Sequence, residues 1–147
     1  MRRSAVCLIV TLAISACGGD SPSAPSPNIP SVSGRYAGNA TLVAPELDAR
    51  VTCPASTSIT QSGKTVRIAP IVLTGECGSI SIPVGEVTID ATGAIDGSAS
   101  GSFNEPGCGT YDYVVGSGGF FDREFRISMS ATSSSCYAFN FTGVLSR

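Results

Sequence analysis

The fold class is decided by one stretch near the end of the chain, Tyr137-Ala138-Phe139-Asn140-Phe141-Thr142-Gly143-Val144-Leu145. Its odd-numbered positions hold tyrosine, two phenylalanines, glycine and leucine, whereas most even-numbered positions hold small or polar residues. Successive side chains of a β-strand point to opposite faces of the sheet. The alternation therefore predicts a strand with one buried face.

A second segment, Phe121 to Met129, alternates in the same way. One face carries Phe121, Phe125, Ile127 and Met129, and the other carries Asp122, Glu124, Arg126 and Ser128. The glycine pair Gly118-Gly119 directly before it predicts a turn. Arg123 falls between two phenylalanines on the apolar face. It either points inward to meet an anionic ligand or a tyrosine, or lies near a strand end and reaches water along its stem, which is the more common arrangement.

The remaining segments extend this pattern over the whole domain. Further short strands are predicted at Tyr36–Leu42, Ile59–Gln61, Thr65–Ala69, Ser79–Val84, Glu86–Ile89, Ala94–Phe103 and Thr110–Val115, with turn-forming residues between most of them. No segment shows the spacing of three and four that an amphipathic helix requires. The sequence predicts an all-β, antiparallel meander of about eight strands. A closed barrel is favoured because closure removes both edges, and a β-sandwich is the alternative.

The N-terminal segment has the layout of an export signal. Two arginines precede an apolar run from Val6 to Ala16, which is too short to span a bilayer as a helix. Ile14-Ser15-Ala16-Cys17 resembles the lipobox of bacterial lipoproteins. The resemblance implies cleavage after residue 16 and acylation of Cys17, and Gly18 then implies delivery to the outer membrane. We expect a protein of the cell envelope that is anchored by lipid.

The rest of the chain divides into a tether and one domain. Residues 17–32 contain four prolines and no apolar periodicity, which is typical of an extended tether. Residues 33–147 have the length of one small domain. Loss of Arg2 and Arg3 with the signal leaves seven basic and eleven acidic residues, a formal charge of −4. This charge argues against nucleic acid as a partner. A monomer is expected.

Four cysteines lie within the domain, at positions 53, 77, 108 and 136. An even count in an exported protein predicts two disulfides, and four cysteines allow three pairings. Neighbouring strands of a meander favour Cys53 with Cys77 and Cys108 with Cys136. A zinc site is disfavoured because there is no CxxC spacing and no histidine, and the sequence suggests no cofactor.

The absence of histidine also excludes every imidazole-based catalytic arrangement. Asp122 and Glu124 are two residues apart and leave open a carboxylate-based glycan hydrolase. They alternate with Arg126 on the predicted solvent face, which favours a surface ion pair instead. We therefore expect a protein without enzymatic activity.

Two short motifs resemble those of families of small β-barrels. Ser33-Gly34-Arg35-Tyr36 is similar to the Gly-x-Trp start of lipocalin-like and avidin-like barrels, and Leu145-Ser146-Arg147 would bring an arginine near it. The resemblance implies a carrier of a small apolar or anionic molecule. Its candidate ligand-binding residues are Tyr36, Phe125, Phe139 and Phe141, with Arg123 as the polar contact.

The second motif, Ser98-Ala99-Ser100-Gly101-Ser102-Phe103, resembles the Ser-Gly-x-x-Tyr loop of membrane-bound inhibitors of c-type lysozyme. This resemblance implies an exposed loop that contacts a protein partner through Ser98, Ser100, Gly101 and Phe103. A closed interior would eliminate the ligand hypothesis, and an open interior lined by aromatic residues would favour it.

Overall fold

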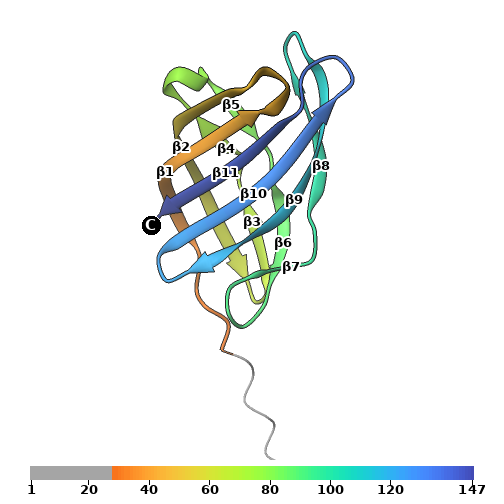
Figure 1. Cartoon of the computed structure of the whole chain (residues 1–147). Helices are drawn as coiled ribbons and strands as arrows, with labels where there is room; N and C mark the ends of the chain where they lie inside the picture. The colour runs from red at the N-terminus through yellow and green to blue at the C-terminus, as the bar shows by residue number, and fades with distance from the viewer. Residues whose placement is uncertain (1–27) are drawn as a thin grey trace, which may run out of the picture.

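The computed structural model describes residues 28–147, which fold into eleven strands and two single-turn 3-10 helices (Figure 1). The signal segment, Cys17 and the first part of the predicted tether lie outside the described residues. The strands are β1 (Gly34–Ala44), β2 (Ala49–Ser62), β3 (Thr65–Ile68), β4 (Ile71–Leu73), β5 (Ile80–Ile82), β6 (Gly85–Ile89), β7 (Ile95–Asp96), β8 (Ser100–Glu105), β9 (Gly109–Phe121), β10 (Glu124–Ser133) and β11 (Phe139–Ser146). The 3-10 helices are η1 (Pro45–Leu47) and η2 (Gly75–Cys77). Within residues 28–147, no helix has the length and apolar character needed to cross a bilayer.

All strands pair antiparallel in one curled sheet, so the predicted all-β antiparallel class is confirmed. The main path is β7-β6-β3-β2-β1-β11-β10-β9-β8, and β4 and β5 branch from β2. The β-sandwich alternative is wrong, since there is a single sheet rather than two packed ones. Two of the predicted strands, at Tyr36–Leu42 and Tyr137–Leu145, correspond to the central pair β1 and β11, which lie side by side.

The barrel is only partly closed, which corrects the expectation of full closure. At one end, Ala94 forms an isolated bridge with Gly119, and the N–H of Phe120 donates to the carbonyl of Gly93 at 2.8 Å. At the other end, β5 and β8 are sheet edges and no pairing joins them in the described part of the chain. Pro83 has no N–H to donate and ends β5 after three residues. That edge is therefore too short to continue the ladder to β8.

The hairpin between β9 and β10 corrects a second expectation. Phe121 to Met129 is not one strand, because Asp122 and Arg123 form a two-residue turn in which Asp122 has φ 57°. Phe120 and Phe125 face each other on the inner side, while Phe121 and Arg123 are exposed. A two-residue turn exchanges the odd and even faces of the chain. The alternation was read as one continuous strand across this turn, and Arg123 was therefore placed on the apolar face.

The glycine pair before this hairpin lies inside β9 and does not form a turn. A Cβ on Gly119 would lie 2.9 Å from the carbonyl oxygen of Gly93 and 3.0 Å from the Cα of Ala94. Glycine is required here because the chain leading into β7 approaches β9 this closely.

The core fills the centre of the barrel. Phe125, Phe141 and Leu145 are fully buried, as are several aliphatic side chains from β3 to β6. Phe120 and Phe125 stack with ring centroids 4.8 Å apart, and Tyr36 meets both rings edge-on. These side chains fill the barrel at its centre and toward the end where β1 begins.

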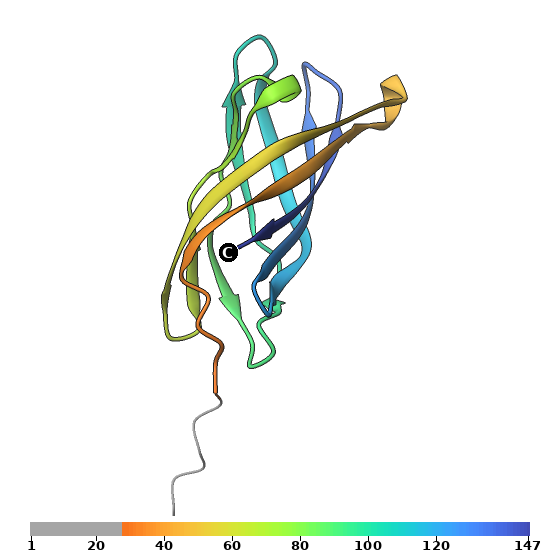
Figure 2. The same cartoon turned by 90° about the vertical axis from the view of Figure 1, so that its left-hand side faces the viewer.

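Part of the predicted tether packs against the domain. Val32 is 3% exposed, and its N–H donates to Gln61 Oε1 at 2.8 Å. Gln61 Nε2 in turn donates to the carbonyl of Pro30 at 2.9 Å, and Arg147 Nη1 donates to the carbonyl of Ser33 at 3.0 Å. We call this the tether end of the barrel and the opposite end the mouth (Figure 2).

Candidate functional site

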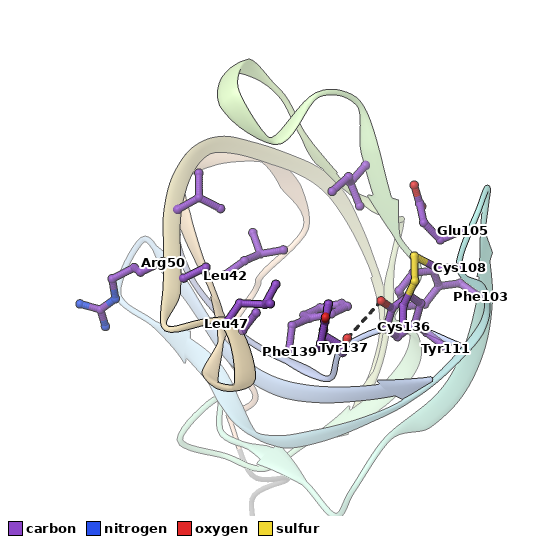
Figure 3. Close-up of a pocket in the computed structure, with 14 residues that line it drawn as sticks. Leu42, Leu47, Arg50, Phe103, Glu105, Cys108, Tyr111, Cys136, Tyr137 and Phe139 are labelled. Atoms are coloured by element: carbon purple, nitrogen blue, oxygen red, sulfur yellow. Dashed lines mark hydrogen bonds between the residues drawn. A yellow bond between two sulfur atoms is a disulfide. The ribbon is translucent and has the colours of Figure 1, made fainter. Parts of the chain in front are cut away.

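A cavity of about 370 Å³ opens at the mouth, and we call it the cup (Figure 3). It lies among the β1–β2 connection, β5, the β8–β9 hairpin and the β10–β11 connection. Its lining is Leu42, Ala44, Leu47, Ala49, Arg50, Val51, Ile80, Phe103, Glu105, Cys108, Tyr111, Cys136, Tyr137 and Phe139. Only two of these residues are charged, so the cup is a predominantly apolar concavity of the size that holds small ligands.

One wall of the cup is a cluster of three aromatic rings. Phe103 stacks on Tyr111 with centroids 5.4 Å apart, and Tyr111 meets Phe139 edge-on at 5.2 Å. The rings come from β8, β9 and β11, where strand alternation turns each of them inward. The cluster presents a rigid apolar surface to whatever occupies the cup.

The disulfide Cys108–Cys136 holds this wall together by joining the β8–β9 hairpin to the β10–β11 connection. Two hydrogen bonds support it. Tyr111 Oη donates to the carbonyl of Tyr137 at 3.1 Å, and Ser133 Oγ donates to the carbonyl of Cys108 at 3.0 Å. Burial raises the pKa of the Tyr111 phenol, and the nearby negative charge of Glu105 raises it further. Tyr111 is thus a neutral hydrogen-bond donor whose proton is already used within the wall.

The second disulfide joins Cys53 to Cys77, so the pairing predicted from the cysteine positions is confirmed. Cys53 is fully buried on β2, and Cys77 belongs to η2. This bridge fixes η2 against the sheet without lining the cup.

The facing wall comes from the β1–β2 connection. Asp48 adopts a left-handed conformation with φ 48°, and its N–H donates to the carbonyl of Pro45 at 3.2 Å. This turn carries Leu47 over the cup with 52% of its surface exposed. Tyr137, on the opposite lip, is 53% exposed. Two large apolar side chains therefore flank the entrance on separate connections.

The ligand-binding residues predicted from the sequence do not form one site. Phe139 lines the cup, but Tyr36 and Phe125 belong to the aromatic cluster nearer the tether end. Phe141 is fully buried in the packed centre, and Arg123 is exposed in the β9–β10 turn at the tether end. The ligand site predicted with Arg123 as its polar contact is therefore wrong.

The segment predicted as a partner loop is mostly a strand. Ser98 is exposed between β7 and β8, whereas Ser100, Gly101 and Phe103 belong to β8. A Cβ on Gly101 would lie 2.6 Å from the hydroxyl of Tyr113, so glycine allows this ring to pass beneath the strand. Phe103 contributes to the aromatic wall of the cup instead of projecting toward a partner.

The carboxylates considered for catalysis lie on the outer surface at the tether end. Glu124 Oε2 accepts from Arg126 Nη2 at 2.6 Å, as the surface interpretation predicts. Asp122 is exposed in the turn. No group of three or more potential metal ligands occurs among residues 28–147.

Sequence reasoning missed most of the cup. The sequence assigned no functional role to four of the lining residues, Leu42, Leu47, Tyr111 and Tyr137. One signal was available, because Tyr111 and Tyr137 closely follow Cys108 and Cys136 in the chain. A disulfide between those cysteines had to bring both tyrosines to one place.

No protein-family model matches this chain, and no curated protein sequence matches it. The site is therefore interpreted from its own geometry.

Proposed function

We propose that this protein is a lipid-anchored envelope protein without enzymatic activity that binds a small, largely apolar molecule in the cup. The observation that carries the proposal is an open, aromatic-lined concavity at one end of an otherwise packed barrel. Apolar concavities with few polar groups are the usual form of small-molecule sites. Leu47 and Tyr137 extend the apolar surface to the entrance, where a ligand would first make contact.

The proposed anchor supports this arrangement. The lipobox resemblance assigns the lipid to Cys17, which precedes the described residues. The described chain begins at the tether end, beside Gln61 and Arg147, and the cup lies at the opposite end (Figures 1 and 2). A protein anchored in this way would present the mouth away from the membrane. Incorporation of an alkyne-labelled fatty acid into the wild-type chain, and its loss in Cys17→Ala, tests the anchor.

Binding is tested with N-phenyl-1-naphthylamine, a neutral apolar dye that fluoresces when it leaves water. The protein is the chain from residue 17 onward with Cys17→Ser, which retains every described residue and carries no lipid. We expect saturable fluorescence enhancement. Ala44→Trp should weaken dye binding at least tenfold, because the indole would fill the cup from its lining.

Ala37→Trp is the matched control, since Ala37 is on the same strand but is exposed on the outer face. Its dye affinity should equal that of the parent protein. The proposal fails if the folded parent protein shows no saturable binding. It also fails if the two tryptophan variants bind the dye equally well.

A further inference from the structure

The charges of the described domain are unevenly divided between its two ends. Four acidic residues and one basic residue lie in or beside the connections at the mouth, namely Glu46, Asp48, Glu76 and Glu105 with Arg50. The other six of the seven basic residues in residues 28–147 belong to strands and turns nearer the tether end, where five acidic residues, Glu86, Asp90, Asp96, Asp122 and Glu124, reduce the net charge to about +1. The mouth is therefore locally negative, in contrast to the other end of the barrel.

Glu105 is the acidic residue that faces the cup. The inner side of β8 carries Gly101, Phe103 and Glu105 in alternation, which places Glu105 at the rim, two residues beyond Phe103 on the same face. It forms no ion pair with any residue in the described part of the chain. Its charge also contributes to the raised pKa of the Tyr111 phenol, as expected for a carboxylate near that ring.

Arg50 does not balance this charge inside the cup. It alternates with Val51 and Cys53 on β2, so it belongs to the outer face, and its guanidinium points away from the cavity (Figure 3). Only its aliphatic stem contributes to the lining. Arg123, the residue first expected to attract an anion, lies at the other end of the barrel.

The interior of the cup offers no free side-chain hydrogen-bond donor. The Tyr111 hydroxyl is already bonded, and no buried side-chain polar atom is unsatisfied in residues 28–147. A charged head group placed deep in the cup would lose its water shell, and the Tyr111 oxygen is the one side-chain acceptor there that could replace part of it. The polar end of any ligand is therefore kept at the rim, where it meets Glu105.

We infer that the cup selects apolar ligands with a cationic head group, an amine or a quaternary ammonium, over ligands with an anionic one. This inference rests on the proposed function and specifies its ligand class. The apolar tail occupies the aromatic-lined cavity while the head group lies beside Glu105. A carboxylate or sulfate head group would be repelled there by Glu105 and by the surrounding acidic residues.

The test compares three ligands with the same ten-carbon tail: decyltrimethylammonium, decanol and decanoate. Each displaces the dye at pH 7.5 and low ionic strength, with the two ionic ligands kept below their micelle concentrations and decanol below its solubility limit. We expect decyltrimethylammonium to bind at least fivefold more tightly than decanoate, with decanol between them. A partly exposed charge pair contributes up to about 1 kcal/mol, which corresponds to about fivefold in affinity. The differences in affinity between the three ligands should become smaller in 0.5 M salt, which screens the charges.

Two variants identify the residue responsible. Glu105→Gln should reduce the preference to less than twofold, and Glu105→Lys should reverse it. Glu86→Gln is the matched control, because it makes the same substitution at an exposed residue of β6 that does not line the cup, and it should leave decyltrimethylammonium favoured at least fivefold. Circular dichroism establishes that each variant is folded.

The possible outcomes separate this inference from the proposed function. If the dye binds but decanoate and decyltrimethylammonium displace it with equal affinity, the inferred charge selection is wrong and the proposed apolar site is retained. If Glu105→Gln keeps the full preference, Glu105 does not select the head group and the inference is overturned. If the dye does not bind the parent protein, the proposed function itself fails.

Discussion

Removing the disulfide Cys108–Cys136 should damage the cup, whereas removing Cys53–Cys77 should not. The first bridge joins two of the connections that line the cavity, and the second fixes η2 outside it. The perturbation is the double variant Cys108→Ala/Cys136→Ala. Its matched control is Cys53→Ala/Cys77→Ala.

The two bridges should contribute similarly to stability. They close loops of sequence separation 28 and 24, and the chain-entropy relation assigns about 3.5 kcal/mol to each. The control variant also loses the fully buried sulfur of Cys53, so its cost should be at least as large. Urea unfolding followed by circular dichroism measures both losses. A comparable decrease in stability is expected in the two variants.

Ligand binding should distinguish them. Without Cys108–Cys136, the β10–β11 connection is held at the wall only by hydrogen bonds such as the one from Tyr111 to Tyr137. Ordering even one residue on binding costs about 1–2 kcal/mol, which corresponds to roughly a tenfold loss of affinity. Dye titration in buffer, where both variants remain folded, should show this loss only in the Cys108→Ala/Cys136→Ala protein. Equal affinities in the two variants would refute the assignment of this bridge to the cup.

Three further predictions concern the folded domain. Phe125→Ala should reduce the free energy of unfolding by about 3–5 kcal/mol, because the ring is fully buried. Phe121→Ala, on the exposed side of the same hairpin, should reduce it by less than about 1 kcal/mol. Similar losses for the two variants in urea unfolding would contradict the packing described. Gly93→Ala should lower the melting temperature by several degrees more than Gly63→Ala, because an added Cβ would lie 2.3 Å from a carbonyl oxygen at the first site and meets nothing within 4 Å at the second. The Asp90 carboxylate accepts three hydrogen bonds from the turn that follows it, and these bonds lower its pKa below the usual value for an aspartate. The ionised carboxylate therefore stabilises the fold above pH 4, and this contribution is lost as the pH falls through the lower pKa of the folded state. Asp90→Asn should be less stable than wild type at pH 6, and the difference in stability should shrink toward pH 2. A difference that stays constant with pH would show that the Asp90 charge is not its source.

The features that depend on local pattern could be predicted from the sequence. Alternation over Tyr137–Leu145 corresponds to β11, in which Phe141 and Leu145 are fully buried. The disulfide pairing was predicted by joining cysteines that are close in the chain, and it is correct although Cys77, Cys108 and Cys136 lie in connections rather than in strands. Both inferences use only near neighbours in sequence, where β-structure leaves few alternatives.

Two kinds of feature could not be predicted from the sequence. The first depends on whether odd-numbered or even-numbered residues face inward, and the second depends on contacts between distant parts of the chain. Two strands joined by a two-residue turn can show the same local alternation as one continuous strand. For that reason Arg123 was placed on the wrong face. The glycines of β9 resemble turn residues in sequence, although they permit close approach to the chain leading into β7. The cup draws its lining from four separate parts of the chain, which no local pattern relates to one another.

The location of both disulfides in the mouth half of the barrel bears on what the cup is for. The tether end is closed by packing and hydrogen bonds, through the Phe120–Phe125 stack and the contacts of Val32 with Gln61. The mouth lacks the side chains that would fill it, and an unfilled cavity forgoes the packing contacts that stabilise a core. Cross-links that constrain the unfolded chain offset this deficit without occupying the space. A larger residue at Ala44 or Ala49 would fill part of this space, and under the proposed function these two alanines keep the cup open for a ligand.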